Sequence, residues 1–457
     1  MKYILIIYSF LCFFSSCKPT NEVLDNHVAA FPLRFDADTV LFDTLIATNK
    51  VSVTKRLMVY NTSANAIRIN SIFIGNKFSS PFSIYINGQK GVAFDNVEIL
   101  GTDSLLILVN VTVAPNNVDH VYIITDSLNF VVNNFSKHVV LNTWGQDAFF
   151  HVNDTIASNI TLSNAKPHVI YGNYVVSHTG ELHIPQATKL MFYNNASLIV
   201  NGKLDVLGTK AQKVIFCSFR QDKEYADLPG QWKGIVFNSM NISHVFSWVS
   251  ISNAEHGLFF NKTCNANFVL SNAIIANVSK SCISTYNAAV TLSNSVLYRS
   301  MNGLLNVYGG DFKAYNNTIT NYSSGFSNSS PCVMVDDSYS MLKVSMINNI
   351  VWGSASKEFS IELSNSLSTD ITIKNNILKL ADLPLYPANI LIADNAKFKL
   401  KNTSILNFMP DTISQNPLVL SPAFNKGEVL PLFTDVDDFN GNSRDSSPDI
   451  GAVEIVD

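Results

Sequence analysis

The chain has 457 residues, of which 47% are hydrophobic and only 14% are charged, and its net charge is −4 at pH 7. Ordinary globular domains carry about 25% charged residues; here Asn, Ser and Thr fill the deficit, and β-branched residues are abundant, which favours an all-β fold. The length is enough for two or three domains, and the absence of a Lys/Arg run argues against nucleic acid as a partner.

The N-terminal segment 1–17, MKYILIIYSFLCFFSSC, is typical of an export signal. Lys2 precedes an apolar stretch from Tyr3 to Phe14, which is too short to span a bilayer. The segment Phe14-Ser15-Ser16-Cys17 resembles the lipobox of bacterial lipoproteins, with Phe14 in place of the usual Leu. The resemblance implies that Cys17 is acylated and anchors the protein in a membrane. A plain cleaved signal peptide is the alternative.

Residues 18–30 are polar and aperiodic, so we expect a tether between the lipid and the first folded domain. No later apolar segment is long enough to span a bilayer as a helix, and none is predicted to cross a membrane. The expected location is the outer membrane, facing either the periplasm or the outside.

Short strand patterns separated by Asn, Gly, Asp and Pro fill residues 31–150 and predict a β-sandwich. Four segments in this range, FDADTVLFDTL, KRLMVYN, APNN and WGQDA, resemble the immunoglobulin-like module that precedes β-helices in Bacteroidetes surface lipoproteins. The resemblance implies a stalk or an N-terminal cap rather than a catalytic domain.

Internal repetition is the strongest pattern in the chain. An Asn before an aliphatic pair recurs at Asn272, Asn294 and Asn316 in steps of 22, then at Asn348 and Asn375 after steps of 32 and 27, with Asn402 as a weaker copy. A coil of about 22 residues accommodates three short strands that pair only with the coils above and below. We therefore predict a right-handed parallel β-helix over residues 166–420, with an insertion near 323–333.

The recurring Asn suits a left-handed turn between two strands, and stacked coils would bring these side chains into a ladder. Helical repeats are excluded because Asn-rich, β-branched coils do not form helices.

Two further segments resemble bacterial β-helix proteins. Residues 174–217 are similar to the entry of many parallel β-helices. The tail, 421–457, resembles their closing segment SPAxxxG…DxxGxxR…DIGAxE, matched here by Asp438, Gly441, Arg444, Asp449, Gly451 and Glu454. The resemblance implies a cap segment, and we expect it to cover an open end of the helix.

Four cysteines follow the leader, Cys217, Cys264, Cys282 and Cys332, without CxxC or zinc-ligand spacing. We expect them to be small buried side chains. Pairing of Cys264 with Cys282 is the alternative.

The densest charge cluster, residues 220–235, is the first candidate site. Aromatic rings beside charged groups suit sugar binding, so the predicted ligand contacts are Trp232, Tyr225, Arg220 and Asp227. Asp222 and Glu224 are weak candidates for the two carboxylates of a glycoside hydrolase. In the alternative interpretation the loop is structural and Trp232 plugs a groove.

Polysaccharide lyase chemistry needs a base and a cation, and Asp336, Asp337 and Lys343, with Lys374 or Arg299, come nearest to such a set. The Asp pair could bind Ca²⁺, although two carboxylates are too few ligands. The acidic run Asp435, Asp437 and Asp438 lacks the full EF-hand pattern and fits the tail segment better. No cofactor and no metal site is expected.

We therefore expect a lipid-anchored envelope protein that binds glycan or another envelope component through a β-helix face, without catalysis. A polysaccharide lyase or glycoside hydrolase, and a purely structural or adhesive surface protein, are the alternatives.

Overall fold

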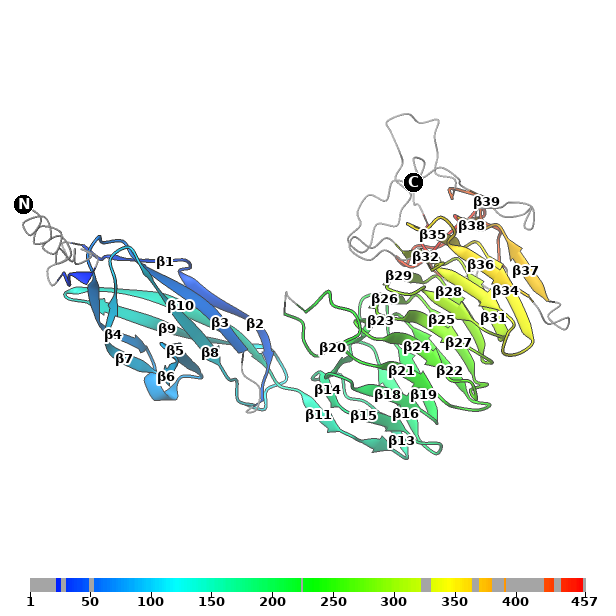
Figure 1. Ribbon diagram of the computed structural model, residues 1–457. Coiled ribbons are helices and arrows are strands. Elements are labelled where there is room, and N and C mark those ends of the chain that lie inside the picture. Colours follow the sequence, from blue (N-terminus) through cyan, green and yellow to red (C-terminus); the bar gives the residue numbers. More distant parts are fainter. Residues whose placement is uncertain are drawn as a thin grey trace, which may run out of the picture. The chain divides into compact units, whose positions relative to one another are not determined.

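The computed structural model describes residues 22–25, 30–48, 53–222, 225–321, 330–363, 370–379, 390–391, 423–430 and 437–454. The chain divides into two compact units, Met1–Ala148 and Phe149–Asp457 (Figure 1). Apart from one short 3-10 helix, Lys77–Ser79, the named elements are strands, which confirms the all-β prediction. No helix among these residues is long and apolar enough to cross a membrane.

The N-terminal unit is a sandwich of two five-stranded sheets, as predicted. Neighbouring strands are antiparallel except for β2 and β10, which are parallel. The first sheet has the order β1 (Leu33–Phe35), β3 (Val53–Asn61), β8 (Ser104–Val111), β5 (Phe82–Ile86) and β6 (Gln89–Gly91). The second has the order β2 (Thr39–Ile46), β10 (Phe135–Gln146), β9 (Tyr122–Val132), β4 (Ile67–Ile74) and β7 (Ala93–Ile99).

Alternation of side chains along each strand builds the core of this sandwich. Leu57, Val59, Ile107 and Val109 are fully buried, while the residues between them face outward. Because the side-chain period of a strand is two residues, the apolar half of each pattern defines the inner face of its sheet.

In the C-terminal unit the described residues form a parallel β-helix of nine complete coils, each of which gives one strand to each of three sheets. We call these sheets faces 1, 2 and 3. Face 1 consists of β11 (Phe149–Val152), β14 (His168–Tyr171), β17 (Lys189–Phe192), β20 (Val214–Ser218), β23 (Val249–Ser252), β26 (Ile274–Val278), β29 (Val296–Ser300), β32 (Thr318–Asn321), β35 (Ile350–Gly353), β38 (Ile377–Leu378) and β39 (Ile390–Leu391).

Face 2 consists of β12 (Thr155–Ile156), β15 (Asn173–Val176), β18 (Ser197–Val200), β21 (Gly234–Phe237), β24 (His256–Phe260), β27 (Ser281–Thr285), β30 (Leu305–Val307), β33 (Val333–Asp336) and β36 (Phe359–Glu362). Face 3 consists of β13 (Asn159–Thr161), β16 (Glu181–Pro185), β19 (Lys203–Leu207), β22 (Ser243–Ser247), β25 (Asn267–Ser271), β28 (Ala289–Ser293), β31 (Gly310–Tyr315), β34 (Leu342–Ile347) and β37 (Ile371–Lys374). The predicted insertion falls between β32 and β33, where residues 322–329 lie outside the described residues.

The first coil begins at Phe149, so the predicted start at Lys166 is one coil late. β11 already pairs in parallel with β14, with Phe149 opposite His168. The strands of this coil, β11, β12 and β13, have only 4, 2 and 3 residues and carry no Asn-aliphatic unit, so the repeat pattern does not reveal them.

Cys217, Cys264, Cys282 and Cys332 are free and buried, which confirms the interpretation as small buried side chains and rules out a Cys264–Cys282 disulfide. Cys264, Cys282 and Cys332 lie inside the coils with the aliphatic and aromatic side chains of the helix core. Burial raises the pKa of the Cys217 thiol to about 11, so the thiol stays protonated and unreactive at neutral pH.

The turn predicted at the recurring Asn is confirmed: Asn272, Asn294, Asn316, Asn348 and Asn375 have φ angles of 52, 46, 54, 61 and 52°. The amide ladder inside the coils is formed by the residue that follows. Asn317 Nδ2 donates to Asn349 Oδ1 at 2.9 Å, and Asn349 Nδ2 donates to Asn376 Oδ1 at 2.9 Å. Among the turn residues themselves, Asn348 donates to Asn316 at 2.9 Å.

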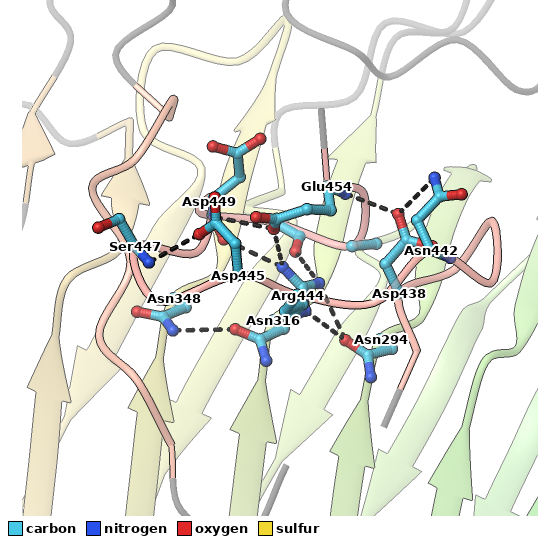
Figure 2. A network of polar contacts seen from close by, with 12 residues as sticks. Asn294, Asn316, Asn348, Asp438, Asn442, Arg444, Asp445, Ser447, Asp449 and Glu454 are labelled. Atoms are coloured by element: carbon cyan, nitrogen blue, oxygen red, sulfur yellow. Dashed lines mark hydrogen bonds and ion pairs between the residues drawn. The ribbon is translucent and has the colours of Figure 1, made fainter. Parts of the chain in front are cut away.

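The described part of the tail, residues 437–454, lies along the side of the β-helix, contrary to the predicted position over an open end (Figure 2). Asn272 Nδ2 donates to the carbonyls of Asp437 and Asp438 at 3.2 and 2.8 Å, and the Gly451 amide donates to the Asn348 carbonyl. The tail lies here because the outward side chains of face 1 are apolar: Phe439 and Ala452 pack with Val296 and other residues of β26 and β29.

A buried ion pair holds the tail together. Arg444 Nη1 lies 3.0 Å from Glu454 Oε2, and both side chains are almost fully buried. Arg444 Nη2 also donates to Asn294 Oδ1 at 3.0 Å, which ties the tail to a turn of the β-helix, and the Glu454 amide donates to Asp438 at 2.7 Å (Figure 2). The residues matched to the closing motif therefore attach the tail to the side of the β-helix.

Within the described ranges, no group of three or more His, Cys, Asp or Glu could hold a metal ion.

Removing a rung of the inner amide ladder should strongly destabilise the β-helix. Asn349 also donates to the Ala314 carbonyl and accepts from the Asn317 amide, so Asn349→Ala leaves buried donors and acceptors without partners. We expect its free energy of unfolding in urea to fall by about 2–4 kcal/mol. Asn261→Ala, which removes an exposed rung of another ladder, should cost less than about 1 kcal/mol. Equal losses for the two variants would contradict this account.

Candidate functional site

Trp232, one of the predicted ligand contacts, lies in the core of the β-helix. Its side chain has no exposed surface, its ring stacks on Phe192 with centroids 4.0 Å apart, and its Nε1 donates to the Ser252 carbonyl at 2.8 Å. This burial contradicts a role in ligand contact, because no face of the ring is open. It agrees with the alternative in which Trp232 is a structural plug.

The other residues of the loop are engaged with one another or with the next coils. The Arg220 guanidinium lies 3.2 Å from the Tyr225 ring centroid and 2.9 Å from Asp222, and Asp227 lies 3.4 Å from Arg299. The loop backbone is also fixed: Asn253 Nδ2 donates to two loop carbonyls. Glu224, the second carboxylate of the hydrolase hypothesis, lies outside the described residues.

The lyase candidates Asp336, Asp337 and Lys343 do not form a common site in the structure. Asp336 ends β33 on face 2 and accepts the Ser338 amide at 2.9 Å, whereas Asp337 is buried. Lys343 belongs to β34 on face 3, and its Nζ lies 3.4 Å from Asp370. Lys374 is likewise paired with Glu428, and Arg299 with Asp227.

A row of polar and aromatic residues follows the strands of face 2, one residue per coil, and we call it the face-2 row. Strand register places these residues above one another along the helix axis: Val200 pairs with Phe237, Phe237 with Phe260, and Val307 with Val335. Each member of the row is the residue that directly follows one of these paired strand positions. The members are Asn201, Asn238, Asn261, Tyr286, Tyr308 and Asp336.

The first half of the row is an amide ladder and the second half is aromatic. Asn238 donates to Asn201 at 3.0 Å and Asn261 donates to Asn238 at 3.1 Å. The rings of Tyr286 and Tyr308 then stack with centroids 4.8 Å apart and an interplanar angle of 17°. This separation matches the roughly 4.8 Å distance between neighbouring strands, so one ring per coil produces the stack.

A loop of the eighth coil widens this aromatic surface. The Tyr339 amide donates to the Tyr308 carbonyl, and Ser340 Oγ donates to the Tyr286 carbonyl, so the loop folds back over earlier coils. The Tyr339 ring meets Tyr286 edge to face at 5.4 Å, and 44% of Tyr339 is exposed. Lys262 Nζ lies 5.5 Å from both ring centroids.

The face-2 row, together with Tyr339 and Lys262, therefore combines an exposed tyrosine ring, hydroxyls, amides and one ammonium group on a single surface. Burial, together with the neighbouring Tyr286 and Asp336, raises the pKa of Tyr308, so its hydroxyl stays protonated and can donate a hydrogen bond. Such a surface can stack against the apolar face of a sugar ring and hydrogen-bond its hydroxyls. The residue pattern contained one signal for it: Tyr286 and Tyr308 are separated by the same step as Asn272 and Asn294, which is the coil period.

A second aromatic strip runs along face 1 in the first four coils, from Phe150 near the start of β11 to residues at or directly after the ends of β14, β17 and β20. Its rings are Phe150, Tyr171, Tyr193 and Phe219, with Tyr171 and Tyr193 4.8 Å apart and Tyr193 and Phe219 5.5 Å apart. Tyr193 is 40% exposed, close to the value for Tyr339. Among the described residues, no cation lies over these rings as Lys262 does over Tyr286, and the strip supplies a matched control for the face-2 row.

No protein-family model and no curated protein matches the sequence. Among solved structures, a family 123 glycoside hydrolase of Clostridium perfringens is similar at 7% identity and a TM-score of 0.18, over 26% of this chain and 30% of that chain. A PapD-like domain of human CEP192 (8% identity, TM-score 0.17) aligns with 25% of this chain and 84% of its own length. A Porphyromonas gingivalis protein of unknown function (13%, TM-score 0.18) aligns over 29% and 60%. None of these likenesses assigns a function to the chain.

Trp232→Ala should act on stability and not on ligand binding. Loss of the ring leaves a cavity next to Phe192, so we expect the free energy of unfolding to fall by about 3–5 kcal/mol. Trp232→Phe keeps an aromatic ring stacked on Phe192 and loses only the hydrogen bond to the Ser252 carbonyl, so its free energy of unfolding should fall much less. Urea denaturation measures both. A Trp232→Phe variant that is fully stable yet no longer binds any ligand of the wild type would contradict the structural role.

Acid should destabilise the β-helix through buried neutral histidines. His244 is fully buried between the Leu204 backbone and Ser239, and burial lowers its pKa to about 4, against about 6.5 for histidine in an unfolded chain. Since the unfolded state takes up the proton first, stability falls as the pH drops from about 6.5 to about 4, by on the order of 3 kcal/mol for this group. Urea midpoints measured across this range should decline less steeply in His244→Asn. An identical pH slope in the variant and the wild type would refute the assignment.

Proposed function

We propose that this chain is a lipid-anchored protein of the bacterial cell envelope that binds an extended polysaccharide along the face-2 row without cleaving it. The observation that carries this proposal is the stack of Tyr286 and Tyr308 over successive coils, with the Tyr339 ring against Tyr286 and with Lys262 and Asp336 beside them. The prediction of binding through a face of the β-helix is kept, but the contacts move from Trp232 and Tyr225 to these residues.

A polymer fits this surface better than a small sugar does. The coils advance by about 4.8 Å, so a glycan lying parallel to the helix axis meets a new row position at each step. Stacked rings also demand little reorganisation on binding, because Tyr286 and Tyr308 already contact each other and the loop of Tyr339 is held by hydrogen bonds.

The envelope location rests on the leader. A signal segment ending at Cys17 predicts acylation, and the first described residue, Glu22, follows Cys17 by five positions. We propose the outer membrane as the location, with the β-helix facing either the periplasm or the outside.

A lyase or hydrolase remains the rival function, and it requires an acid and a base in one groove. Each proposed catalytic cation of this chain already pairs with a carboxylate that is not its proposed partner: Lys343 with Asp370 and Lys374 with Glu428. Product release from a polysaccharide panel is the direct test, and turnover that Asp336→Asn abolishes would establish catalysis at this row.

Replacing the exposed ring should weaken binding selectively. Affinity electrophoresis against a panel of neutral and acidic polysaccharides should show retardation of the wild type by at least one of them. Tyr339→Ala should weaken that binding about fivefold, since one aromatic contact contributes about 1 kcal/mol. Tyr193→Ala, a similarly exposed ring on the other strip, should bind like the wild type. Equal losses for both variants, or no retardation by any polysaccharide, would contradict the proposal.

A further inference from the structure

The outer face of the first N-terminal sheet combines exposed apolar, aromatic and basic side chains. Strand register places Leu108 of β8 between Arg56 of β3 and Tyr85 of β5, and Tyr85 opposite Lys90 of β6. Leu106, on the same face of β8, is 46% exposed and Leu108 is 37% exposed. These side chains form one continuous surface across four strands, which we call the basic face.

The charged side chains on the strands of this surface are basic, and one carboxylate, that of Asp36 directly after β1, accepts the Met58 amide at its edge. Arg34, Arg56 and Lys90 face outward, and none of the outward-facing strand residues of this sheet is Asp or Glu, although the chain as a whole carries a net charge of −4. Two of the cations lie over aromatic rings: Arg34 is 4.2 Å from the Tyr60 centroid, and Lys90 is 5.8 Å from that of Tyr85.

The chain enters the sandwich at one end of this surface. Leu24 pairs with Ala66, and the Asp25 amide donates to the Ala66 carbonyl at 2.8 Å. The turn that leads to Ala66 follows the end of β3, where Tyr60 pairs with Arg34. Glu22 is five positions after Cys17, a span of at most about 18 Å for an extended chain. An acyl group on Cys17 would therefore hold this end of the sheet close to a bilayer.

We infer that the basic face docks on an anionic membrane surface beside the anchor, an inference that rests on the acylation of Cys17 included in the proposed function. Tyrosine and leucine with a basic rim match the headgroup layer, where aromatic rings sit at the interface and basic side chains are attracted to anionic lipids. A soluble acidic polymer would use the cations and leave Leu106 and Leu108 in water, so the exposed apolar residues favour the membrane.

Vesicle co-sedimentation of the mature chain, starting at residue 17 and carrying Cys17→Ser to remove the acyl group, tests this inference. The protein should bind vesicles of equal parts phosphatidylglycerol and phosphatidylcholine at least tenfold more strongly than vesicles of phosphatidylcholine alone. The double variant Arg56→Glu/Lys90→Glu should lose at least tenfold of that binding, and Leu108→Ser should lose severalfold. Lys137→Glu, an exposed cation on β10 of the opposite sheet, should behave like the wild type.

Absent binding, equal binding to both vesicle types, or an unchanged double variant would overturn the inference. Binding of a soluble acidic polysaccharide by this face without vesicle binding would also overturn it. Because the tested chain has no acyl group, these outcomes do not depend on the lipid anchor, which the mass of the mature N-terminal peptide reports separately. The vesicle-binding outcomes are also independent of polysaccharide binding by the β-helix, which the Tyr339→Ala variant tests.

Discussion

Parallel pairing of every coil with its two neighbours is the constraint on which the rest of this structure depends. A strand in the β-helix has no partner within its own coil, so its backbone hydrogen bonds form only when adjacent coils are in register. Register in turn brings equivalent positions of successive coils together along the axis. The buried ladder from Asn317 to Asn376 and the stacked pair Tyr286 and Tyr308 are two results of the same constraint.

The same constraint explains the tail. A row of left-handed Asn turns leaves side-chain amides and backbone carbonyls pointing outward at regular intervals, and the tail forms hydrogen bonds with them. The Asn272 side chain donates to the Asp438 carbonyl, Arg444 donates to the Asn294 side chain, and the Gly451 amide donates to the Asn348 backbone carbonyl. Burying Arg444 and Glu454 together removes two charges from water, which is unfavourable unless both are fully hydrogen-bonded. The guanidinium of Arg444 and the carboxylate of Glu454 do find partners, which fixes where the tail lies.

The architecture could be predicted from the residues because repeats and strand patterns are local. The constant step between Asn272, Asn294 and Asn316 identified both the coil length and the left-handed turns. The first coil was missed because its short strands carry no repeat. The side position of the tail was missed because it depends on which outward side chains, such as Val296, need cover, and that is decided by contacts distant in sequence.

The candidate site was harder to predict for a related reason. Charge and aromatic density in residues 220–235 suggested a ligand site, but a Trp next to charged residues is equally suited to fill a coil, as Trp232 does. The tyrosines of the face-2 row are isolated in the sequence, and only the stacking of coils and the return of the loop at Tyr339 bring them together. The local density of charged and aromatic residues therefore pointed to a loop that is structural, whereas the aromatic surface follows from the periodic position of its tyrosines along the coils.

A crystal structure of the protein with an oligosaccharide from a polysaccharide that it retards is the most direct test of the central claim. The account predicts sugar rings against Tyr286 and Tyr339, with the glycan running parallel to the helix axis. A glycan bound at residues 220–235, on the aromatic strip of face 1, or across the coils instead of along them would contradict it.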